Sequence, residues 1–192
     1  MSGSLAIEPP TDAALVARVL GGDERRAFAE LVLRHQSAVR NLLRRLTRND
    51  HALADDLAQE TFIQVFRNLR QFRGDAKFST WIYRIAYNAF LAHARSRPAT
   101  QELPDQLTDE ASADDAMPSL ARSSALKLDL ERALTRLSPN ERDAIVHCYY
   151  QDLSHEEAAF VLGCPLGTLK TNVLRAKHKL RTILTAWSPA AD

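Results

Sequence analysis

The sequence has few of the residues that build disulfide-rich, turn-rich or membrane-spanning proteins. Its 192 residues include only two cysteines, Cys148 and Cys164, whose spacing makes neither a CxxC pair nor a disulfide framework. Glycine is scarce, at 6 residues, which favours helices over a turn-rich β fold. No stretch reaches the roughly 18 uninterrupted apolar residues of a membrane span, and the N-terminus lacks the basic start of a secretion signal. We therefore expect a helical protein of the reducing cytoplasm.

Signatures of catalysis and of metal binding are also missing. The sequence contains no Walker A loop, no GxSxG and no HExxH motif. The remaining candidates for zinc ligands are His147, Cys148, His155 and Cys164. Their spacing matches none of the usual zinc-ligand pairs, and we interpret them as core or surface residues. We predict a protein that is not an enzyme and that needs no metal or cofactor.

The formal net charge of +1 conceals a strong segregation of charge along the chain. Acidic residues are nearly absent from residues 67–97 and fully absent from residues 166–181, and both segments are rich in arginine or lysine. Residues 98–118 show the reverse, with six acids, no base, and many alanine, serine and proline residues. This pattern predicts an all-α protein with two small helical domains, at 12–97 and 126–187, joined by a flexible acidic linker at 98–125.

Apolar periodicity predicts the helices of each domain. In the first domain it marks helices over about 28–46, 52–72 and 79–97, which we expect to pack as a small bundle. In the second, a leucine stripe over 126–137 ends before Ser138, which together with Glu141 forms a capping-box pattern. Ser154 and Glu157 repeat that pattern at the start of a short helix. A turn over 164–167 then leads to a last helix, capped by Thr168 and running to about 186.

A helix, a glycine-containing turn and a basic second helix are typical of a helix-turn-helix. We assign the apolar side of the last helix to Leu169, Val173, Leu180 and Leu184. The side chains left to face outwards are Lys170, Thr171, Asn172, Arg175, Lys179 and Arg181. Such a face could read base edges and neutralise phosphates in a major groove, or it could be the solvated basic side of a bundle.

Residues 72–88 interleave aromatic and basic side chains. Single-stranded DNA binding requires this combination, because bases stack on planar rings while cations follow the phosphates. The spacing of Trp81 matches the apolar stripe of its helix, so we interpret its ring as core. The better contact candidates are Lys77, Arg84, Tyr87 and Asn88.

An acidic patch lies at residues 55–60, near the start of a predicted helix. The residues alone favour a simple interpretation, in which Asp55 and Asp56 interact with the helix dipole. The alternative is that the patch binds a basic partner.

Four motifs, at 55–62, 78–88, 153–159 and 163–170, closely resemble those of the extracytoplasmic-function (ECF) subfamily of bacterial RNA polymerase sigma factors, within the sigma-70 family. They occur in the family's order. The resemblance implies a promoter-specificity subunit whose domain at 12–97 is sigma region 2 and whose domain at 126–187 is sigma region 4. The first would bind core RNA polymerase and recognise and help to melt the minus-ten element; the second would read the minus-thirty-five element.

The resemblance also implies site residues. Polymerase binding would fall on Asp55, Asp56, Gln59, Glu60 and Phe62, which reverses the dipole interpretation. Minus-ten contacts would be Arg73, Lys77, Phe78, Ser79, Arg84, Tyr87 and Asn88. Minus-thirty-five contacts would be Thr168, Lys170, Thr171, Asn172, Arg175 and Lys179. The triplet at 171–173 departs from the Ser-Arg-aliphatic sequence frequent in the family, so the promoter preference is expected to differ.

The partners implied by the resemblance are core RNA polymerase, promoter DNA in duplex and single-stranded form, and an anti-sigma factor that is often membrane-bound. Two other interpretations remain open at the level of sequence. A stand-alone helix-turn-helix regulator would explain the basic last helix, but neither the acidic patch nor the aromatic and basic segment. A helical adaptor that binds only protein would use its basic faces for solubility.

Overall fold

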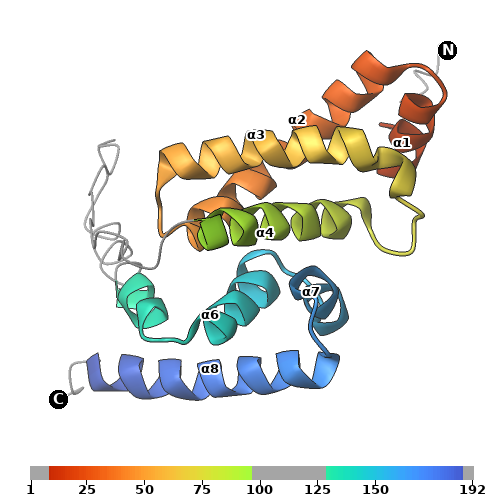
Figure 1. Cartoon of the computed structure of the whole chain (residues 1–192). Coiled ribbons are helices and arrows are strands. Elements are labelled where there is room, and N and C mark those ends of the chain that lie inside the picture. Colours follow the sequence, from red (N-terminus) through yellow and green to blue (C-terminus); the bar gives the residue numbers. More distant parts are fainter. Residues whose placement is uncertain (1–8, 97–128, 188–192) are drawn as a thin grey trace, which may run out of the picture. The chain divides into compact units, whose positions relative to one another are not determined.

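Every regular element in the described part of the chain is a helix (Figure 1). The computed structural model describes residues 9–96 and 129–187. The chain divides into two compact units, of which the first contains residues up to 92 and 160–163, and the second the remaining residues. The all-α prediction is confirmed. The predicted acidic linker at 98–125 lies outside the described residues.

The first unit contains α1 (Asp12–Leu20), α2 (Glu24–Leu46), α3 (His51–Asn68), the short 3₁₀ helix η1 (Leu69–Gln71) and α4 (Phe78–Ser96). Helices α1 and α3 both pack against α2. The three helices predicted here are confirmed to within a few residues, with η1 forming the last part of the second. Helix α1 was not predicted, because nine residues carry too little periodicity to identify a helix.

Large aliphatic side chains hold the first unit together. Leu31, Leu42, Val65 and Ile82 are each at most 1% exposed, so α2, α3 and α4 all contribute to the core. Helix α1 is fixed by polar contacts as well. Asp12 in its first turn pairs with the His35 ring at 2.9 Å and with Arg34 at 3.3 Å, both on α2.

The second unit contains a helical segment at 129–135, α6 (Pro139–Ile145), the π-helical turn η2 (Val146–Tyr150), most of α7 (His155–Leu162) and α8 (Leu166–Trp187). Both predicted capping boxes are confirmed. The backbone N–H of Ser138 donates to Glu141 Oε2 at 3.0 Å, and that of Ser154 donates to Glu157 Oε2 at 2.9 Å. These bonds satisfy backbone donors that a helix start leaves without partners.

The turn before α8 is shorter than the predicted 164–167. The prediction that Thr168 caps the last helix is therefore wrong. Gly163 adopts a left-handed φ of +63°, and the N–H of Cys164 donates to the Ala159 carbonyl at 3.1 Å. The chain reverses there, so α8 begins at Leu166 and Leu169 N–H already donates to the Pro165 carbonyl at 3.1 Å. Thr168 therefore lies inside the first turn of α8 and does not cap it.

Buried apolar side chains form the core of the second unit. Leu134, Leu137, Ile145 and Ala176 form a buried cluster, against which Leu130, Tyr150 and Leu180 pack. Leu169 and Val173 are buried as predicted, whereas Leu184 is 36% exposed, so the apolar side of α8 weakens towards its C-terminal end.

The described part of the chain was also searched for membrane spans and metal sites. Within residues 9–96 and 129–187, no helix is both long and apolar enough to cross a bilayer. The same residues contain no group of three or more histidine, cysteine, aspartate or glutamate side chains that could hold a metal ion.

Candidate protein-binding and DNA-binding surfaces

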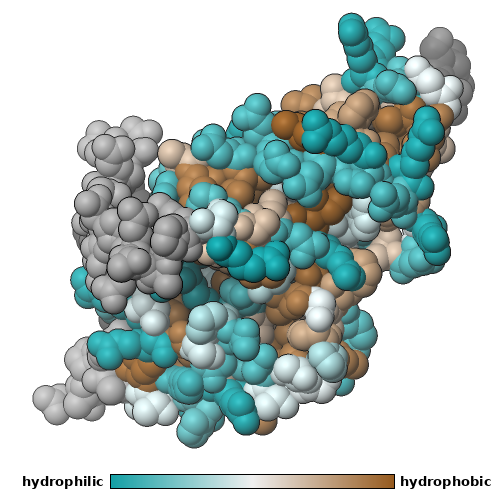
Figure 2. All heavy atoms as spheres, viewed as in Figure 1, coloured by the Kyte–Doolittle hydropathy of each residue, from teal (hydrophilic) through white to brown (hydrophobic). Residues whose placement is uncertain are grey.

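A groove of about 830 Å³ runs between α2 and α3 in the first unit. Its apolar wall comes from both helices and includes Phe28, Val32, Phe62, Ile63 and Phe66, while Arg25, Arg40, Asp55, Asp56, Gln59 and Arg67 supply polar lining. Figure 2 shows apolar surface interrupting the hydrophilic surface over α2 and α3. The predicted acidic patch is therefore one wall of a groove that also exposes hydrophobic side chains.

The large apolar side chains around this groove are unusually open to solvent. Phe66 is 45% and Ile63 39% exposed, and Phe66 meets Phe28 edge-on with ring centroids 4.9 Å apart. Leu33, one residue after the groove-lining Val32, is 68% exposed. Exposed apolar side chains beside polar ones mark interaction sites on soluble proteins.

The acidic residues of α3 lie too far along the helix to serve mainly its dipole. Asp50 is the N-cap of α3 and accepts from Leu53 N–H at 3.0 Å, and the first turn contains no acid. Asp55 and Asp56 come after that turn, where the influence of the dipole has faded. Asp55 pairs with Arg40 at 3.3 Å across the groove, while Asp56 and Gln59 are exposed. This arrangement favours the second interpretation, a surface for a basic partner.

The loop between η1 and α4 carries the exposed cations of the predicted minus-ten segment. Gly74 has a φ of +80°, which permits the sharp turn, and Arg73 and Lys77 on either side are exposed. Below them lies an aromatic cluster in which Phe78 packs against Phe72 at 5.2 Å and Trp81 at 5.8 Å. This cluster packs at the two ends of the loop and fixes its position.

Two of the predicted minus-ten contacts are buried. Phe78 is 4% exposed because its ring is enclosed by Phe72, Trp81 and His35, so it is a core residue. Tyr87 is 7% exposed and offers no open ring face for a base to stack on. Trp81, which we expected in the core, is only half-buried. The error has one cause: on a helix, aromatic spacing does not show which ring fills the core.

The other predicted residues on α4 differ in exposure. Asn88 is exposed, whereas Ser79 and Arg84 are half-buried. Ser79 lies in the first turn of α4, directly after the exposed loop.

The outward face of α8 contains part of the predicted set. Four of the predicted contacts are exposed: Thr168, Lys170, Thr171 and Arg175. Asn172 is half-buried because it lies towards the side of the helix that packs on the unit. The Thr171 hydroxyl donates to the Gly167 carbonyl at 2.9 Å, which fixes its side chain against the helix.

Lys179, which the resemblance assigns as a DNA contact, also serves the fold. Its Nζ donates to Glu141 Oε2 at 2.7 Å, joining α8 to the start of α6. The Glu141 side chain is only 6% exposed, and the bonds from Lys179 and Ser138 hold the pKa of its carboxyl below the ordinary value of 4.5. A lysine engaged in this way is less available for phosphates.

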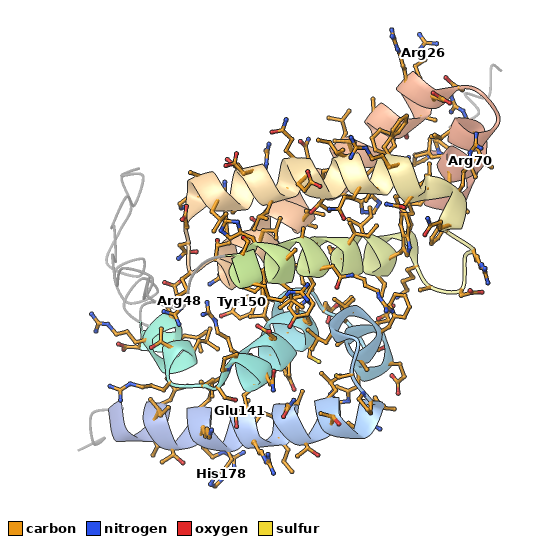
Figure 3. All side chains as sticks on the ribbon, in the orientation of Figure 1. Arg26, Arg48, Arg70, Glu141, Tyr150 and His178 are labelled. Atoms are coloured by element: carbon orange, nitrogen blue, oxygen red, sulfur yellow. The ribbon has the colours of Figure 1, made fainter. Side chains whose placement is uncertain are left out.

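Sequence reasoning missed two residues on the outward face of α8. Leu174 is 70% exposed and His178 is also exposed, and Figure 3 shows His178 directed away from α6. Both lie on the face of Thr171, three and seven residues further on. Helical periodicity counted from Thr171 would have found them.

Two titratable groups of the second unit, one buried and one partly buried, lie outside these surfaces. Burial lowers the pKa of His147 to about 4, and its Nδ1 lies 2.8 Å from the Asp143 carbonyl. Burial raises the pKa of the Cys148 thiol, although the charge of Lys177 opposes the change. A thiol with a raised pKa is a poor nucleophile and a poor metal ligand, in agreement with our interpretation of Cys148 from the sequence.

Comparisons with known proteins agree with this arrangement. Residues 31–100 match the family described as Sigma-70 region 2, and residues 127–180 match Sigma-70, region 4. The chain is 34% identical over 186 residues to the ECF RNA polymerase sigma-E factor of Haemophilus influenzae, covering 90% of this chain and 95% of that protein. It is 38% identical over 165 residues to the ECF RNA polymerase sigma factor SigE of Mycolicibacterium smegmatis, covering 84% of this chain and 63% of that longer protein.

Two solved structures share the fold. CnrH, in complex with the cytosolic domain of CnrY, is 27% identical with a TM-score of 0.66, covering 91% of this chain and 97% of CnrH. The sigma factor RpoE of Bartonella quintana, in complex with the anti-sigma factor NepR, is 25% identical with a TM-score of 0.63, covering 82% and 96% of the two chains. With region 2 and region 4 matched in order and this identity over most of its length, the chain belongs to the ECF sigma factors of the sigma-70 family.

Proposed function

We propose that this chain binds core RNA polymerase, directs it to promoters and assists DNA melting, while the polymerase performs all the chemistry. In this proposal residues 12–97 act as region 2, residues 98–125 as a linker and residues 126–187 as region 4. The chain is not an enzyme and acts in the cytoplasm, where the polymerase is. The membership of the family and the two different surfaces support this assignment.

The groove between α2 and α3 is the proposed polymerase-binding site, and it is the observation that carries the function. Its exposed Phe66 and Ile63 offer apolar area to a partner helix, and Asp56 and Gln59 beside them offer charge and hydrogen bonds. Aromatic anchors bordered by polar groups are the usual composition of protein interfaces. A regulator that acts on DNA alone would have no use for this groove.

The loop around Gly74 and the exposed side of α4 are the proposed minus-ten site. Arg73 and Lys77 would follow the phosphates of the melted strand, and Asn88 would offer hydrogen bonds to a base. A base moved out of the stack costs a few kcal/mol, which these contacts must offset. Since Phe78 supports the loop from within, its proposed role changes from contact to support.

Helix α8 is the proposed reader of the minus-thirty-five element. Lys170 and Arg175 lie on its outward face, where they reach base edges or phosphates when the helix enters the major groove. Thr168 and Thr171 near the start of the helix complete the proposed contact set.

An anti-sigma factor is the proposed inhibitor. CnrH and the Bartonella RpoE were both solved in complexes, with CnrY and with the anti-sigma factor NepR. By similarity to these, we infer that a comparable protein binds this chain and that the α2–α3 groove contributes to its binding site. An inhibitor bound there would compete directly with the polymerase.

Gel filtration with bacterial core RNA polymerase tests the function. We expect the wild-type chain to co-elute with the polymerase and Asp56→Arg to elute alone, because the reversed charge would repel a basic partner. The matched control is Asp129→Arg, a charge reversal at an aspartate of the second unit whose side chain is 42% exposed, which should still co-elute. Failure of the wild type to co-elute, with tight binding to duplex DNA by itself, would establish a stand-alone regulator instead.

A further inference from the structure

Leu174 is an exposed leucine in the middle of the proposed DNA-reading face. It is 70% exposed, the highest value among the exposed large hydrophobic residues of the described chain. It lies one turn after Lys170 and directly before Arg175, both of which are exposed. The exposed neighbours of Leu174 on this face, Lys170, Thr171, Arg175 and His178, are all polar.

Packing within the unit does not explain this leucine. The apolar side of α8 is formed by Leu169, Val173 and Ala176, which are at most 4% exposed. At 100° per residue, Leu174 is rotated well away from that side and towards Thr171 and His178. Its side chain therefore belongs to the outward stripe and not to the core.

The chemistry of the major groove offers one apolar group at base edges, the C5-methyl of thymine. An apolar side chain that reaches this methyl group recognises it by contact, since it presents no hydrogen bond. A leucine between two cations would be guided to the groove by their phosphate contacts and would then cover such a methyl group. Arginine and lysine beside it cannot make that distinction, because they bind guanine acceptors or phosphates.

We propose that Leu174 is a specificity-determining residue that selects thymine in the minus-thirty-five element by covering its C5-methyl group. This inference rests on the proposed function of α8 and adds to it the identity of one base.

The test uses holoenzyme assembled from the full chain and core RNA polymerase. The preferred minus-thirty-five sequence is first selected from randomised promoter duplexes. Each thymine of that sequence is then replaced, one at a time, by deoxyuridine, which removes only the methyl group. We expect one or two adjacent positions at which wild-type holoenzyme loses about fourfold in affinity, the equivalent of one buried methyl-sized group.

Leu174→Ala should lose this sensitivity, so that its affinities for the thymine and uracil probes at that position become equal. At every other position the ratio of the two affinities should be the same as for the wild type. Leu174→Met, which keeps the apolar reach, should retain most of the preference. Leu184→Ala is the matched control, a second exposed leucine of the same helix in its C-terminal part, and should behave as wild type. A purely structural role of Leu174 would lower affinity for every probe equally.

An identical thymine and uracil profile in wild type and Leu174→Ala would overturn the inference, as would an effect of Leu174→Ala on polymerase assembly alone. A different result would overturn the proposed function of α8 itself: Lys170→Ala and Arg175→Ala would then also leave promoter affinity and its salt dependence unchanged.

Discussion

The two units of this chain expose opposite kinds of surface. The first has a concave groove with partly exposed Phe66 and Ile63 and aspartates on one wall. The second has a convex helix, α8, whose outward face is polar and largely basic, with Leu174 among its exposed side chains. The contrast follows the chemistry of the proposed partners. Binding to a protein is stabilised by burying apolar side chains, whereas DNA presents regularly spaced negative charge that basic side chains neutralise.

The units also differ in how they are held together. The first has a larger core, with Leu31, Leu42 and Ile82 at most 1% exposed. The second has a small cluster around Ile145 and adds a buried carboxylate, Glu141, that ties α6 to α8. In the second unit, the position of α8 is therefore fixed partly by polar bonds. We expect its stability to depend more on pH than that of the first unit.

The largest expected effect is on the pH dependence of the second unit. The pKa of His147 falls from 6.5 to about 4 on folding, so the neutral form is the one that folds. Its contribution is complete above pH 6.5 and is lost as the pH falls towards 4, by about 3 kcal/mol in all. Urea unfolding of the second unit, followed by the NMR signals of backbone amides in α6 and α8, measures this loss.

His147→Leu should flatten the stability curve between pH 6.5 and 4, because the buried group no longer titrates. His178→Leu, at an exposed histidine of the same unit, should leave the slope as in the wild type. An unchanged slope in His147→Leu would mean that another group is responsible for the acid sensitivity.

Binding at the groove should depend on apolar contact as well as on charge. Phe66→Ala is expected to weaken polymerase binding by about 2 kcal/mol, or roughly thirtyfold, as for a central aromatic anchor. The loss should be similar at low and high salt, since the removed contact carries no charge. Fluorescence anisotropy with labelled protein and core polymerase measures both, and Leu20→Ala, at an exposed leucine outside the groove, is the control.

The polar tie in the second unit is expected to have a smaller effect. Glu141→Gln keeps an acceptor for Ser138 but loses the charge-assisted bond with Lys179, so the unfolding free energy should fall by about 1–2 kcal/mol at pH 7. Because folding lowers the pKa of Glu141, its contribution is present above pH 4.5 and disappears as the pH falls further. Glu156→Gln, at an exposed glutamate of α7, should change neither quantity.

The smallest effect separates two basic residues of α8 that the sequence does not distinguish. Arg175→Ala should weaken minus-thirty-five binding by about tenfold and lower the salt slope by roughly one unit, the value for one phosphate contact. Lys179→Ala should lower the stability of the unit and leave the salt slope nearly unchanged, because Lys179 is bonded to Glu141. Equal slopes for the two variants would remove this distinction.

Much of the fold was predictable because it depends on local physics. The helices over α2, α3 and α4 follow from apolar periodicity, and the starts of α6 and α7 follow from Ser138 and Ser154 with a glutamate three residues later. The nine-residue α1 and the exact start of α8 were not predictable. Helix α1 depends on Asp12 contacts with α2, and the start of α8 depends on the backbone conformation of Gly163.

The sequence by itself determined the helical class, the segregated charges and the four motifs of the family, since each is written in the order and spacing of residues. Only the tertiary structure decided which side chains are available. It buries Phe78, joins Lys179 to Glu141 and leaves Phe66 and Leu174 in solvent. Periodicity predicts which residues share a helix face, but not which element packs against that face. The neighbouring helix determines whether a side chain lies in the core, forms an ion pair or stays exposed for a partner.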